Sequence, residues 1–516
     1  MHPSIHAQRT PDKIAVRMAD GGATLTYREL DERSNRVAQL LRACGLQAGD
    51  HIAIVLENHP RYFELAWGAQ RAGVVYTAIN HRLGVDETAY IVGNARAGLV
   101  VSSHRLADTA AGLRRAGEAV AGVGHWLMLD GTVEGWSSCE AALDAMPPTR
   151  IADERAANDM LYSSGTTGRP KGVYSPPDSD AIDAPTTLTN LCASAYGMGP
   201  DTVYLSPAPL YHAAPLRFNM TVMRLGGTCI VMEHFDAQRY LALVEQHRVT
   251  HTQLVPTMFV RMLKLDPALR QRHDLSSLRC AIHAAAPCPV PIKRQMIDWW
   301  GPILWEYYAG TEGNGVTLVD SKAWLDRPGT VGRAVVGVLK ICDDAGDEVP
   351  VGTEGTVYFA QGKAFVYHDD PGKTAGSRNE KGWTTLGDVG RVDADGYLFL
   401  TDRKAFMIIS GGVNIYPQEA ENLLVTHPQV MDAAVFGVPD PEFGEQVKAV
   451  VQLRDPADAG PALADELVSW CREHLAHYKC PKSIDFTDAL PREANGKLYK
   501  RVLRDRYWAG HANRLV

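Results

Sequence analysis

Leu161-Tyr-Ser-Ser-Gly-Thr-Thr-Gly-Arg-Pro-Lys-Gly-Val173 is the stretch from which the rest of this chain can be interpreted. It places glycines, hydroxyl side chains and one lysine in a short segment between apolar residues. Glycines let backbone N–H groups approach an anion closely, and hydroxyl groups add further donors. Lys171 adds a point charge that suits phosphate. The segment therefore predicts a phosphate-binding loop with these candidate residues: Ser163, Ser164, Gly165, Thr166, Thr167 and Gly168.

This loop differs from the P-loop of kinases and GTPases, whose pattern is G-x4-G-K-[ST]. Counting on from Gly165, Pro170 occupies the position of the second glycine. Gly172 follows the lysine, where the pattern requires Ser or Thr. We therefore expect a triphosphate ligand that is held by a loop of another kind.

The composition is that of a large globular protein. At 516 residues the chain exceeds what one hydrophobic core supports, so two or more domains are expected. Asp plus Glu outnumber Lys plus Arg by 60 to 52, and the net charge of −8 argues against a general nucleic-acid binder. No apolar run is long enough to predict membrane insertion, and no apolar signal region follows Met1. Nine cysteines without a C-x-x-C pair favour reduced thiols and a cytoplasmic location.

Helical and strand patterns alternate through most of the chain. Thr26 followed by Glu29 predicts a capping box at the start of a helix that ends near Gly45. This alternation predicts doubly wound α/β layers, whereas residues 330–400 contain short strands with Gly and Asp turns and predict a β-rich subdomain. A short apolar run predicts a buried parallel strand at residues 52–56, and further candidate strands are residues 99–102, 126–129, 229–232 and 250–254.

A domain boundary is expected near Asp402, which divides the chain into residues 1–401 and 402–516. Beyond it, apolar runs at 432–436 and 447–452 and a helical pattern over 463–475 predict a compact α+β module. The segment 176–185 is rich in Pro, Asp and Ala and predicts a surface loop.

Four further segments carry side chains that suit nucleotide chemistry. Tyr307-Tyr-Ala-Gly-Thr-Glu-Gly313 contains Glu312, a carboxylate of the kind that Mg²⁺ binds together with phosphate oxygens. Asp388 lies in a glycine-rich segment, where it could accept both ribose hydroxyls. Thr401-Asp-Arg-Lys404 with Ser410-Gly-Gly-Val-Asn414 supplies an arginine and a flexible backbone, and Lys497 lies on a turn near the carboxyl end. By itself each segment has an ordinary explanation: a solvated Glu, a Gly-Asp turn or a surface lysine.

In this order and spacing, the five segments resemble the acyl-adenylate-forming superfamily of acyl-CoA synthetases, adenylation domains and beetle luciferases. The resemblance extends from Pro11-Asp-Lys-Ile-Ala-Val16 to the Gly496-Lys497 turn. It implies an α/β fold with a large amino-terminal domain of two α/β layered subdomains plus a small β-barrel, and a small, mobile α+β carboxyl-terminal domain. It also implies a reaction in two steps: a carboxylate attacks the α-phosphorus of ATP to give acyl-AMP, and a thiol then attacks the acyl carbonyl after the small domain rotates.

By matching position, the resemblance assigns roles to individual residues. Thr166, Thr167 and Lys171 would hold the β- and γ-phosphates, Thr311 the α-phosphate and Glu312 the Mg²⁺. Fixed cations would neutralise the charge of the in-line transition state, and no general base is needed because a carboxylate is already ionised. The remaining assignments are Tyr308 stacked on adenine beside Ala284, Ala285 and Ala286; Asp388 and Arg403 on ribose; Lys497 between the acid and the α-phosphate; and Gly411 and Gly412 beside the pantetheine tunnel.

Two segments depart from the commonest family pattern. The hinge position, two residues after Arg403, is usually Asp or Lys and is Ala405 here, which puts the balance between the two half-reactions in doubt. Tyr174-Ser-Pro-Pro177 replaces a segment that often ends in Ser-His, and its two prolines stiffen the exit from the phosphate loop.

The acyl pocket is expected to be open. Ala309 stands where family members that use very short acids carry tryptophan, and Gly310 beside it is also small. His212 matches a family position that lines or gates this pocket, although a structural histidine is the ordinary alternative. A medium, long or bulky cyclic carboxylic acid is therefore expected rather than acetate.

The leading interpretation is an ATP-dependent acyl-CoA ligase that uses ATP, Mg²⁺ and coenzyme A. The alternatives are an enzyme that forms acyl-AMP only or loads a separate carrier protein, a luciferase-like oxygenase, and a nucleotide-binding scaffold. The filled positions Lys171, Glu312, Asp388 and Lys497 argue against the scaffold. The expected partners are a carboxylic acid and coenzyme A, with no nucleic acid, and a homodimer is left open.

Overall fold

The structure is a computed structural model that describes residues 1–163, 170–492 and 496–509. The chain forms two compact units. The first comprises Met1–Gln253, His273–Cys280 and Ala364–Ala375. The second comprises the described parts of Leu254–Arg272, Ala281–Lys363 and Gly376–Val516.

The first unit contains a parallel sheet with the strand order β4-β3-β5-β6-β7. Its strands are β3 (His51–Val55), β4 (Val75–Ile79), β5 (Ala97–Ser103), β6 (His125–Leu129) and β7 (Ser137–Ser138). All four pairings are parallel, as the apolar runs at 52–56, 99–102 and 126–129 predicted. Parallel strands of this kind are buried on both faces, which explains why those runs are continuous rather than alternating.

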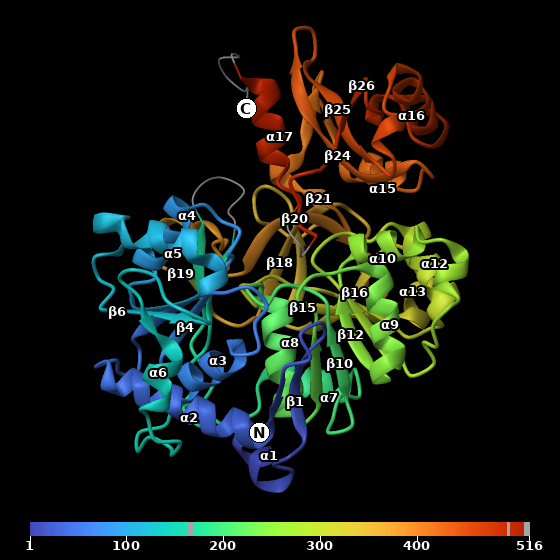
Figure 1. Cartoon of the computed structure of the whole chain (residues 1–516). Helices are drawn as coiled ribbons and strands as arrows, with labels where there is room; N and C mark the ends of the chain where they lie inside the picture. Colours follow the sequence, from blue (N-terminus) through green and yellow to red (C-terminus); the bar gives the residue numbers. More distant parts are fainter. Residues whose placement is uncertain (164–169, 493–495, 510–516) are drawn as a thin grey trace. The chain divides into compact units, whose positions relative to one another are not determined.

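Helices cover both faces of this sheet (Figure 1). Alternate strand residues, among them Val55, Val100 and Met128, pack against α4 and α5 in one core cluster. The capping box predicted for α2 is confirmed, because Thr26 and Glu29 each bond the other's backbone N–H. The helices are α2 (Tyr27–Ala43), α3 (Tyr62–Arg71), α4 (Val85–Asn94), α5 (Ala107–Arg114) and α6 (Cys139–Asp144), with the 3-10 turns η1 (His104–Leu106) and η2 (Gly117–Val120).

A second run of strands in the same unit has the order β12-β10-β11-β1-β2. The pairings are parallel except for the antiparallel pair β1–β2. The strands are β1 (Ile14–Met18), β2 (Thr24–Thr26), β10 (Val203–Ser206), β11 (Thr228–Val231) and β12 (His251–Leu254). The helices of this part are α1 (Pro3–Arg9), α7 (Thr187–Ser194), α8 (Ala213–Arg224) and α9 (Ala237–His247). The predicted surface loop 176–185 contains no helix or strand.

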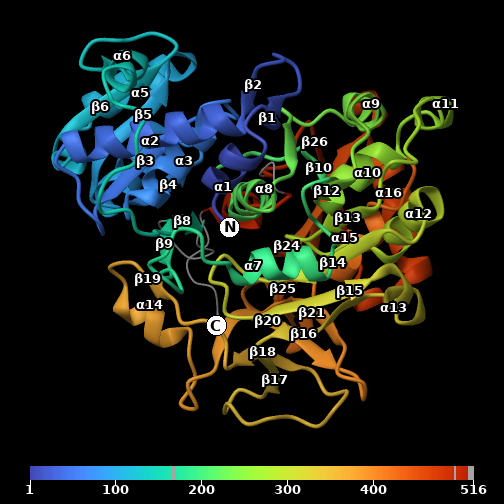
Figure 2. The same cartoon turned by 90° about the horizontal axis from the view of Figure 1, so that it is seen from below.

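The strands that flank the predicted phosphate loop belong to a small sheet of their own, with the order β19-β9-β8. The strands are β8 (Met160–Ser163), β9 (Lys171–Tyr174) and β19 (Val366–Tyr367), and helix α14 (Pro371–Gly376) follows β19. Both pairings are antiparallel, and Ser163 lies opposite Lys171. Figure 2 shows β19 and α14 beside β9. The segment that contains β19 and Asp370 thus packs beside the strand that begins at Lys171, although Asp370 is about two hundred residues later in the sequence.

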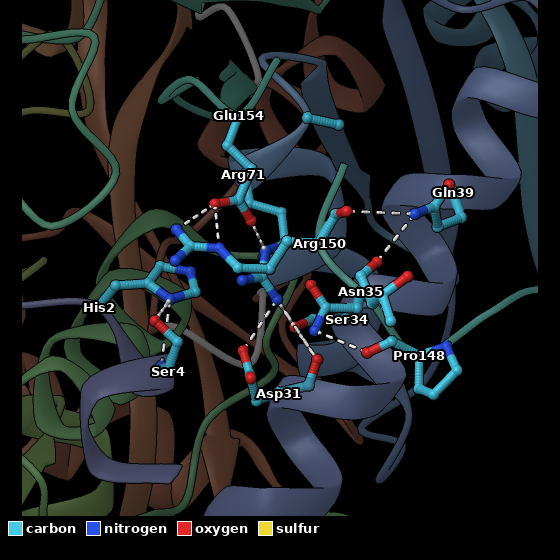
Figure 3. A network of polar contacts seen from close by, with 12 residues as sticks. His2, Ser4, Asp31, Ser34, Asn35, Gln39, Arg71, Pro148, Arg150 and Glu154 are labelled. Atoms are coloured by element: carbon cyan, nitrogen blue, oxygen red, sulfur yellow. Dashed lines mark hydrogen bonds and ion pairs between the residues drawn. The ribbon is translucent and has the colours of Figure 1, made fainter. Parts of the chain in front are cut away.

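A buried polar network fixes the segment that leads into β8 (Figure 3). Arg71, at the end of α3, is fully buried and contacts Asp31 at 2.9 Å and Glu154 at 2.7 Å. The backbone N–H of Arg155 donates to the Arg71 carbonyl at 3.1 Å, and a bridge pairs Tyr76 of β4 with Asp159. Because a buried guanidinium is tolerated only with paired carboxylates, this network ties the approach to β8 firmly to α2 and α3.

The second unit contains a mixed sheet with the order β17-β18-β20-β21-β16-β15-β14-β13. The strands β13 and β14 are parallel, and the remaining pairings are antiparallel (Figure 2). The predicted β-rich region 330–400 is confirmed by β16, β17, β18, β20 and β21. The strands are β13 (Cys280–His283), β14 (Leu304–Tyr308), β15 (Val316–Asp320), β16 (Thr330–Val336), β17 (Val338–Cys342), β18 (Gly355–Ala360), β20 (Thr384–Val392) and β21 (Leu398–Arg403). The helices are α10 (Pro256–Leu263), α11 (Pro267–Arg270), α12 (Val290–Trp300) and α13 (Ser321–Asp326).

The carboxyl-terminal part is a compact α+β module, as predicted. Its sheet has both faces covered: Ala433 and Val435 of β24 join a core with α15 and α16, and Ala434 and Phe436 join another with Leu503 of α17. Because successive side chains of a strand point to opposite faces of the sheet, β24 packs against helices on both sides. The strands are β22 (Ile408–Ser410), β23 (Val413–Ile415), β24 (Val430–Asp440), β25 (Gly444–Leu453) and β26 (Ser483–Thr487). The helices are α15 (Gln418–Leu424), α16 (Pro461–His474) and α17 (Lys500–Trp508), with 3-10 turns η3 (Lys404–Phe406), η4 (Pro456–Asp458) and η5 (His477–Lys479).

Candidate active site

Three of the predicted nucleotide-binding side chains meet in the second unit. Tyr308 is the last residue of β14, and Asp388 and Arg403 lie opposite each other on β20 and β21. The Tyr308 hydroxyl donates to Asp388 Oδ2 at 2.6 Å, and Arg403 Nε donates to Asp388 Oδ1 at 3.0 Å. Both oxygens of the carboxylate are thereby oriented, and each keeps a further lone pair for a ligand hydroxyl.

The electrostatics of this cluster keep Tyr308 protonated. Burial raises the pKa of Tyr308 well above its usual value, and the charge of Asp388 raises it further. The Phe359 ring lies 6.3 Å from the Tyr308 ring, with 26° between their planes. Phe359 therefore fixes the plane of the aromatic ring on which adenine is predicted to stack, a contact that the sequence did not indicate.

Glu312 lies in a tight turn that follows β14. The backbone N–H of Gly313 donates to the Gly310 carbonyl at 3.1 Å, which places Thr311 and Glu312 at the centre of the turn. A Cβ atom at Gly310 would stand 2.7 Å from Glu312 Oε2 and 2.6 Å from Leu386 Cδ1, so a larger residue would displace these side chains. Ala309 precedes this turn directly.

The Glu312 turn fits Mg²⁺ in its donor set. Glu312 is buried, and no group of three or more His, Cys, Asp or Glu side chains with metal-binding geometry occurs among the described residues. Mg²⁺ commonly takes one or two protein carboxylates and completes its shell with water and substrate phosphates. One buried carboxylate beside a threonine hydroxyl matches that preference, whereas a site made wholly of protein ligands would not.

The predicted adenine-flanking segment is strained. Ala284 to Ala286 connect β13 to the residues before α12, and Ala285 has a φ of +76°. A non-glycine residue in this region costs on the order of 1–3 kcal/mol and persists only where the surroundings impose it. The strain agrees with a functional turn at this position, since such outliers cluster at ligand sites.

A buried ion pair supports the two strands that carry these turns. Lys293 Nζ lies 2.5 Å from Glu306 Oε2, and neither side chain is more than 7% exposed. Glu306 is two residues before Tyr308, and His283, which precedes Ala284, lies 3.6 Å from the same carboxylate oxygen. Burial raises the pKa of Glu306, with Lys293 opposing the shift, and burial lowers the pKa of His283. No spacing or motif in the sequence indicated this pair.

The predicted phosphate loop lies in the first unit. Ser164, Gly165, Thr166, Thr167 and Gly168 lie outside the described residues, and of Ser163 only the strand position is described. Lys171 is described, and its Nζ lies 2.8 Å from Asp370 Oδ2. Hydrogen bonds from Lys171 and from the backbone of Lys373 lower the pKa of Asp370, and burial opposes them weakly. Sequence reasoning missed Asp370, because nothing in the sequence relates it to a lysine so far away.

The other predicted residues lie on other elements of the fold. His212 is the N-cap residue of α8 in the first unit, and its ring lies 4.3 Å from the Tyr211 ring. Gly411 and Gly412 form the turn between β22 and β23, with φ values of +56° and +80°. A Cβ atom at Gly411 would stand 2.9 Å from the Phe443 ring, and the positive φ values favour glycine at both positions. Ala405, at the predicted hinge, is exposed within η3.

Lys497 lies on a turn between Leu490 and α17 in the carboxyl-terminal module. The preceding Gly496 has a φ of +85°, which favours glycine. An isolated bridge pairs Arg492 with Leu498 across this turn, so the lysine is presented from a closed loop and not from a free end. Residues 493–495 lie outside the described residues.

Comparison with known proteins identifies the family. The model of the AMP-binding enzyme family matches residues 4–365, and that of the AMP-binding enzyme C-terminal domain matches residues 419–497. The chain therefore belongs to the AMP-binding enzyme family.

Relatives and a solved structure cover nearly the whole chain. Feruloyl-CoA synthase of Amycolatopsis sp is 35% identical over 511 residues, with 98% of each chain covered. The 3-[(3aS,4S,7aS)-7a-methyl-1,5-dioxo-octahydro-1H-inden-4-yl]propanoyl:CoA ligase of Rhodococcus jostii (strain RHA1) is 34% identical over 514 residues, with 95% of each covered. The crystal structure of ATP-bound MatB from Rhodopseudomonas palustris matches with a TM-score of 0.81 and 30% identity, covering 98% of this chain and 99% of that one.

These findings confirm the family, the fold class and the reaction class that the sequence predicted. The chain is an acyl-adenylate-forming enzyme of the acyl-CoA synthetase type, an acid–thiol ligase that uses ATP and coenzyme A. Its fold is mixed α/β, with a large amino-terminal and a smaller carboxyl-terminal domain. Within the described part of the chain, no helix is long and apolar enough to cross a membrane. The boundary at residues 401 and 402 and the individual residue roles stay predictions.

Proposed function

We propose that this ligase activates a bulky, ring-bearing carboxylic acid in the presence of Mg²⁺ and transfers it to coenzyme A. The observation that carries the proposal is that both relatives described above act, by their names, on ring-bearing acids. Ala309 and Gly310 support it, because small residues at the predicted pocket leave room for a ring. His212 is proposed to line the same pocket.

In this proposal, Tyr308, Asp388 and Arg403 bind the nucleoside. The Asp388 carboxylate accepts the ribose hydroxyls while Arg403 and the Tyr308 hydroxyl hold it in place. The Tyr308 ring stacks on adenine, and Ala284 to Ala286 border the base. A buried carboxylate held by two donors recognises a diol without having to reorganise when ATP binds.

Residues of the glycine-threonine loop and of the Glu312 turn are proposed to bind the phosphates. Lys171, Thr166 and Thr167 hold the β- and γ-phosphates, and the Thr311 hydroxyl donates to the α-phosphate. Glu312 would hold Mg²⁺, which supplies neutralisation of phosphate charge when bound. The protein thereby lowers the repulsion that two anions would meet in water.

Lys497 is proposed to contact the acid and the α-phosphate together. A carboxylate oxygen forms a bond to the α-phosphorus while the bond from that phosphorus to pyrophosphate breaks. In the second half-reaction the thiol sulfur of coenzyme A bonds to the acyl carbonyl carbon, and AMP leaves. Gly411 and Gly412 are proposed to border the path of the pantetheine arm.

The test is an assay of the protein with ATP, Mg²⁺ and a panel of acids, with and without coenzyme A, read by mass spectrometry. We expect ferulate and bicyclic propanoates to give CoA thioesters faster than decanoate, palmitate or acetate. A preference for the straight-chain acids would contradict the proposed acid class. Acyl-AMP that persists despite coenzyme A would favour the enzyme that forms acyl-AMP only or loads a carrier protein.

The Lys171–Asp370 pair leads to a prediction about ATP binding. If Lys171 holds phosphate, Asp370 competes with the phosphate for its ammonium group, and Asp370→Asn removes that competitor. Because exposed ion pairs contribute little, we expect the KM for ATP to fall by no more than about five-fold. Steady-state kinetics over a range of ATP concentrations measure this change.

Asp369→Asn is the matched control for that variant. It removes the same charge one residue away, from a carboxylate that pairs with Arg96 at 2.8 Å instead. Its KM for ATP should stay at the parental value. A rise in KM for Asp370→Asn would contradict the prediction and would mean that the carboxylate orients Lys171 for binding.

A cytoplasmic location is also proposed. All nine cysteines lie in the described part of the chain and all are free, which suits a reducing compartment. The homodimer that the sequence left open is tested by sedimentation of the same sample.

A further inference from the structure

We propose that Arg492, held by Asp432, positions the turn that carries Lys497. The inference rests on the role proposed above for Lys497, and it adds a residue pair that does not itself reach the substrates. Arg492 is five residues before Lys497, and Asp432 lies on β24, sixty residues before Arg492. Both belong to the carboxyl-terminal module.

The contacts of Arg492 join the two sides of the turn. Its Nε donates to Asp432 Oδ2 at 2.6 Å, and its Nη2 donates to Asp432 Oδ1 at 2.8 Å. Its Nη1 donates to the carbonyl oxygen of Gly496. That carbonyl and the backbone nitrogen of Lys497 belong to one planar peptide unit, so fixing the carbonyl fixes the start of Lys497.

Backbone contacts close the same turn. The Tyr499 N–H donates to the Pro491 carbonyl at 2.8 Å, and Arg492 pairs with Leu498 as an isolated antiparallel bridge. These contacts bring the chain back on itself beside the peptide that joins Gly496 to Lys497, where Gly496 has a φ of +85°. In the described part of the chain, the Arg492 guanidinium holds this peptide through the Gly496 carbonyl.

Asp432, at the other end of the contact, belongs to strand β24. Asp432 stands where the register between β24 and β25 shifts, two residues after Val430, and the backbone N–H of Ala433 donates to Asp432 Oδ1 at 2.9 Å. Irregularities of this kind turn a side chain away from its regular direction. The Arg492 and Asp432 side chains are 18% and 14% exposed, and the strand is covered on both faces. A partly buried fork of two charge-assisted bonds is stronger and more directional than a surface pair.

Lysine cannot replace arginine in this arrangement. The guanidinium presents donors along two edges, which here serve Asp432 and the Gly496 carbonyl together. An ammonium group keeps the charge but cannot satisfy both acceptors in one plane. Arg492→Lys therefore tests geometry rather than charge, and Asp432→Asn tests the same contact from the other side.

The experiment measures the two half-reactions separately in the full-length protein. Arg492→Lys and Asp432→Asn should each lower the rate of acyl-AMP formation about 10- to 100-fold, the size expected from small misplacement of a catalytic group. Thioester formation from preformed acyl-AMP should stay within about two-fold of the parental rate, since Lys497 acts in the first step. The double variant should be no worse than the worse single variant, because the two residues act as one unit.

Lys448→Met is the matched control. Lys448 forms another partly buried ion pair of this module, at 2.6 Å from Asp485, and neither residue contacts the Lys497 turn in any described hydrogen bond or ion pair. Its adenylation rate should remain parental. A parental rate in Arg492→Lys and Asp432→Asn, or an equal loss in both half-reactions, would overturn the inference. If Lys497→Ala forms acyl-AMP at the parental rate, the role proposed for Lys497 is wrong, and this result is distinct from a failure of the Arg492 inference.

Discussion

Replacing Lys497 with alanine is expected to lower the rate of acyl-AMP formation about 100- to 1,000-fold, because the charge contact proposed for Lys497 in the transition state is lost. Thioester formation from preformed acyl-AMP should change far less, since the acid and the α-phosphate no longer have to be joined. Single-turnover measurements with ATP and acid alone, and with acyl-AMP and coenzyme A alone, separate the two steps. Circular dichroism and thermal unfolding of the variant check that it folds like the parent.

Arg501→Ala provides the control for Lys497→Ala. Arg501 is four residues further on, exposed on the first turn of α17, and pairs only weakly with Asp505 at 3.2 Å. Removing its charge should leave acyl-AMP formation at the parental rate. An unchanged adenylation rate in Lys497→Ala would mean that another cation stabilises the transition state.

Replacing Lys293 with methionine is expected to destabilise the second unit by about 3–5 kcal/mol, because it leaves Glu306 buried without its partner. The contact of Lys293 with the Trp324 ring, 4.7 Å from its centroid, is lost as well. Urea unfolding followed by tryptophan fluorescence measures the change. Lys293→Met/Glu306→Gln should recover much of the loss, because no buried charge then remains.

The same variant should show a defined pH dependence. The pKa of Glu306 is already raised by burial, and losing Lys293 raises it further, so the folded state binds a proton more readily than the unfolded state. Stability of Lys293→Met should therefore fall as pH rises, and its deficit should be smaller at pH 5 than at pH 8. Lys340→Met, which breaks an exposed pair with Glu348, should cost less than about 1 kcal/mol. An equal effect of the two variants would contradict a special role for the buried pair.

Much of the fold could be predicted because its signals are local. The apolar run at 126–129 became β6, the capping box at Thr26 and Glu29 started α2, and the pattern over 463–475 became α16. Each depends on residues within one or two turns or one strand, where periodicity and capping act directly. The observed strand ends differ from the predicted ends by a residue or two, since the last hydrogen bonds of a strand depend on its neighbours.

The candidate site could be predicted only in part from the sequence. Glu312, Asp388, Arg403 and Lys497 could be picked out because their motifs carry unusual residue types in a fixed order. The cross-strand register that places Asp388 opposite Arg403 was not visible in either motif. Nor were the supporting contacts, such as the Phe359 ring beside Tyr308 or the carboxylate beside Lys171.

The sequence by itself determined which chemical groups this protein has, the family to which they belong and the short elements that carry them. Only the tertiary structure decided which charges meet: Lys171 with Asp370, Lys293 with Glu306, and Arg492 with Asp432. The physical reason is the separation along the chain over which each interaction acts. Helix periodicity and capping act over a few residues, whereas an ion pair forms wherever packing brings two side chains within a few ångströms, at any separation along the chain.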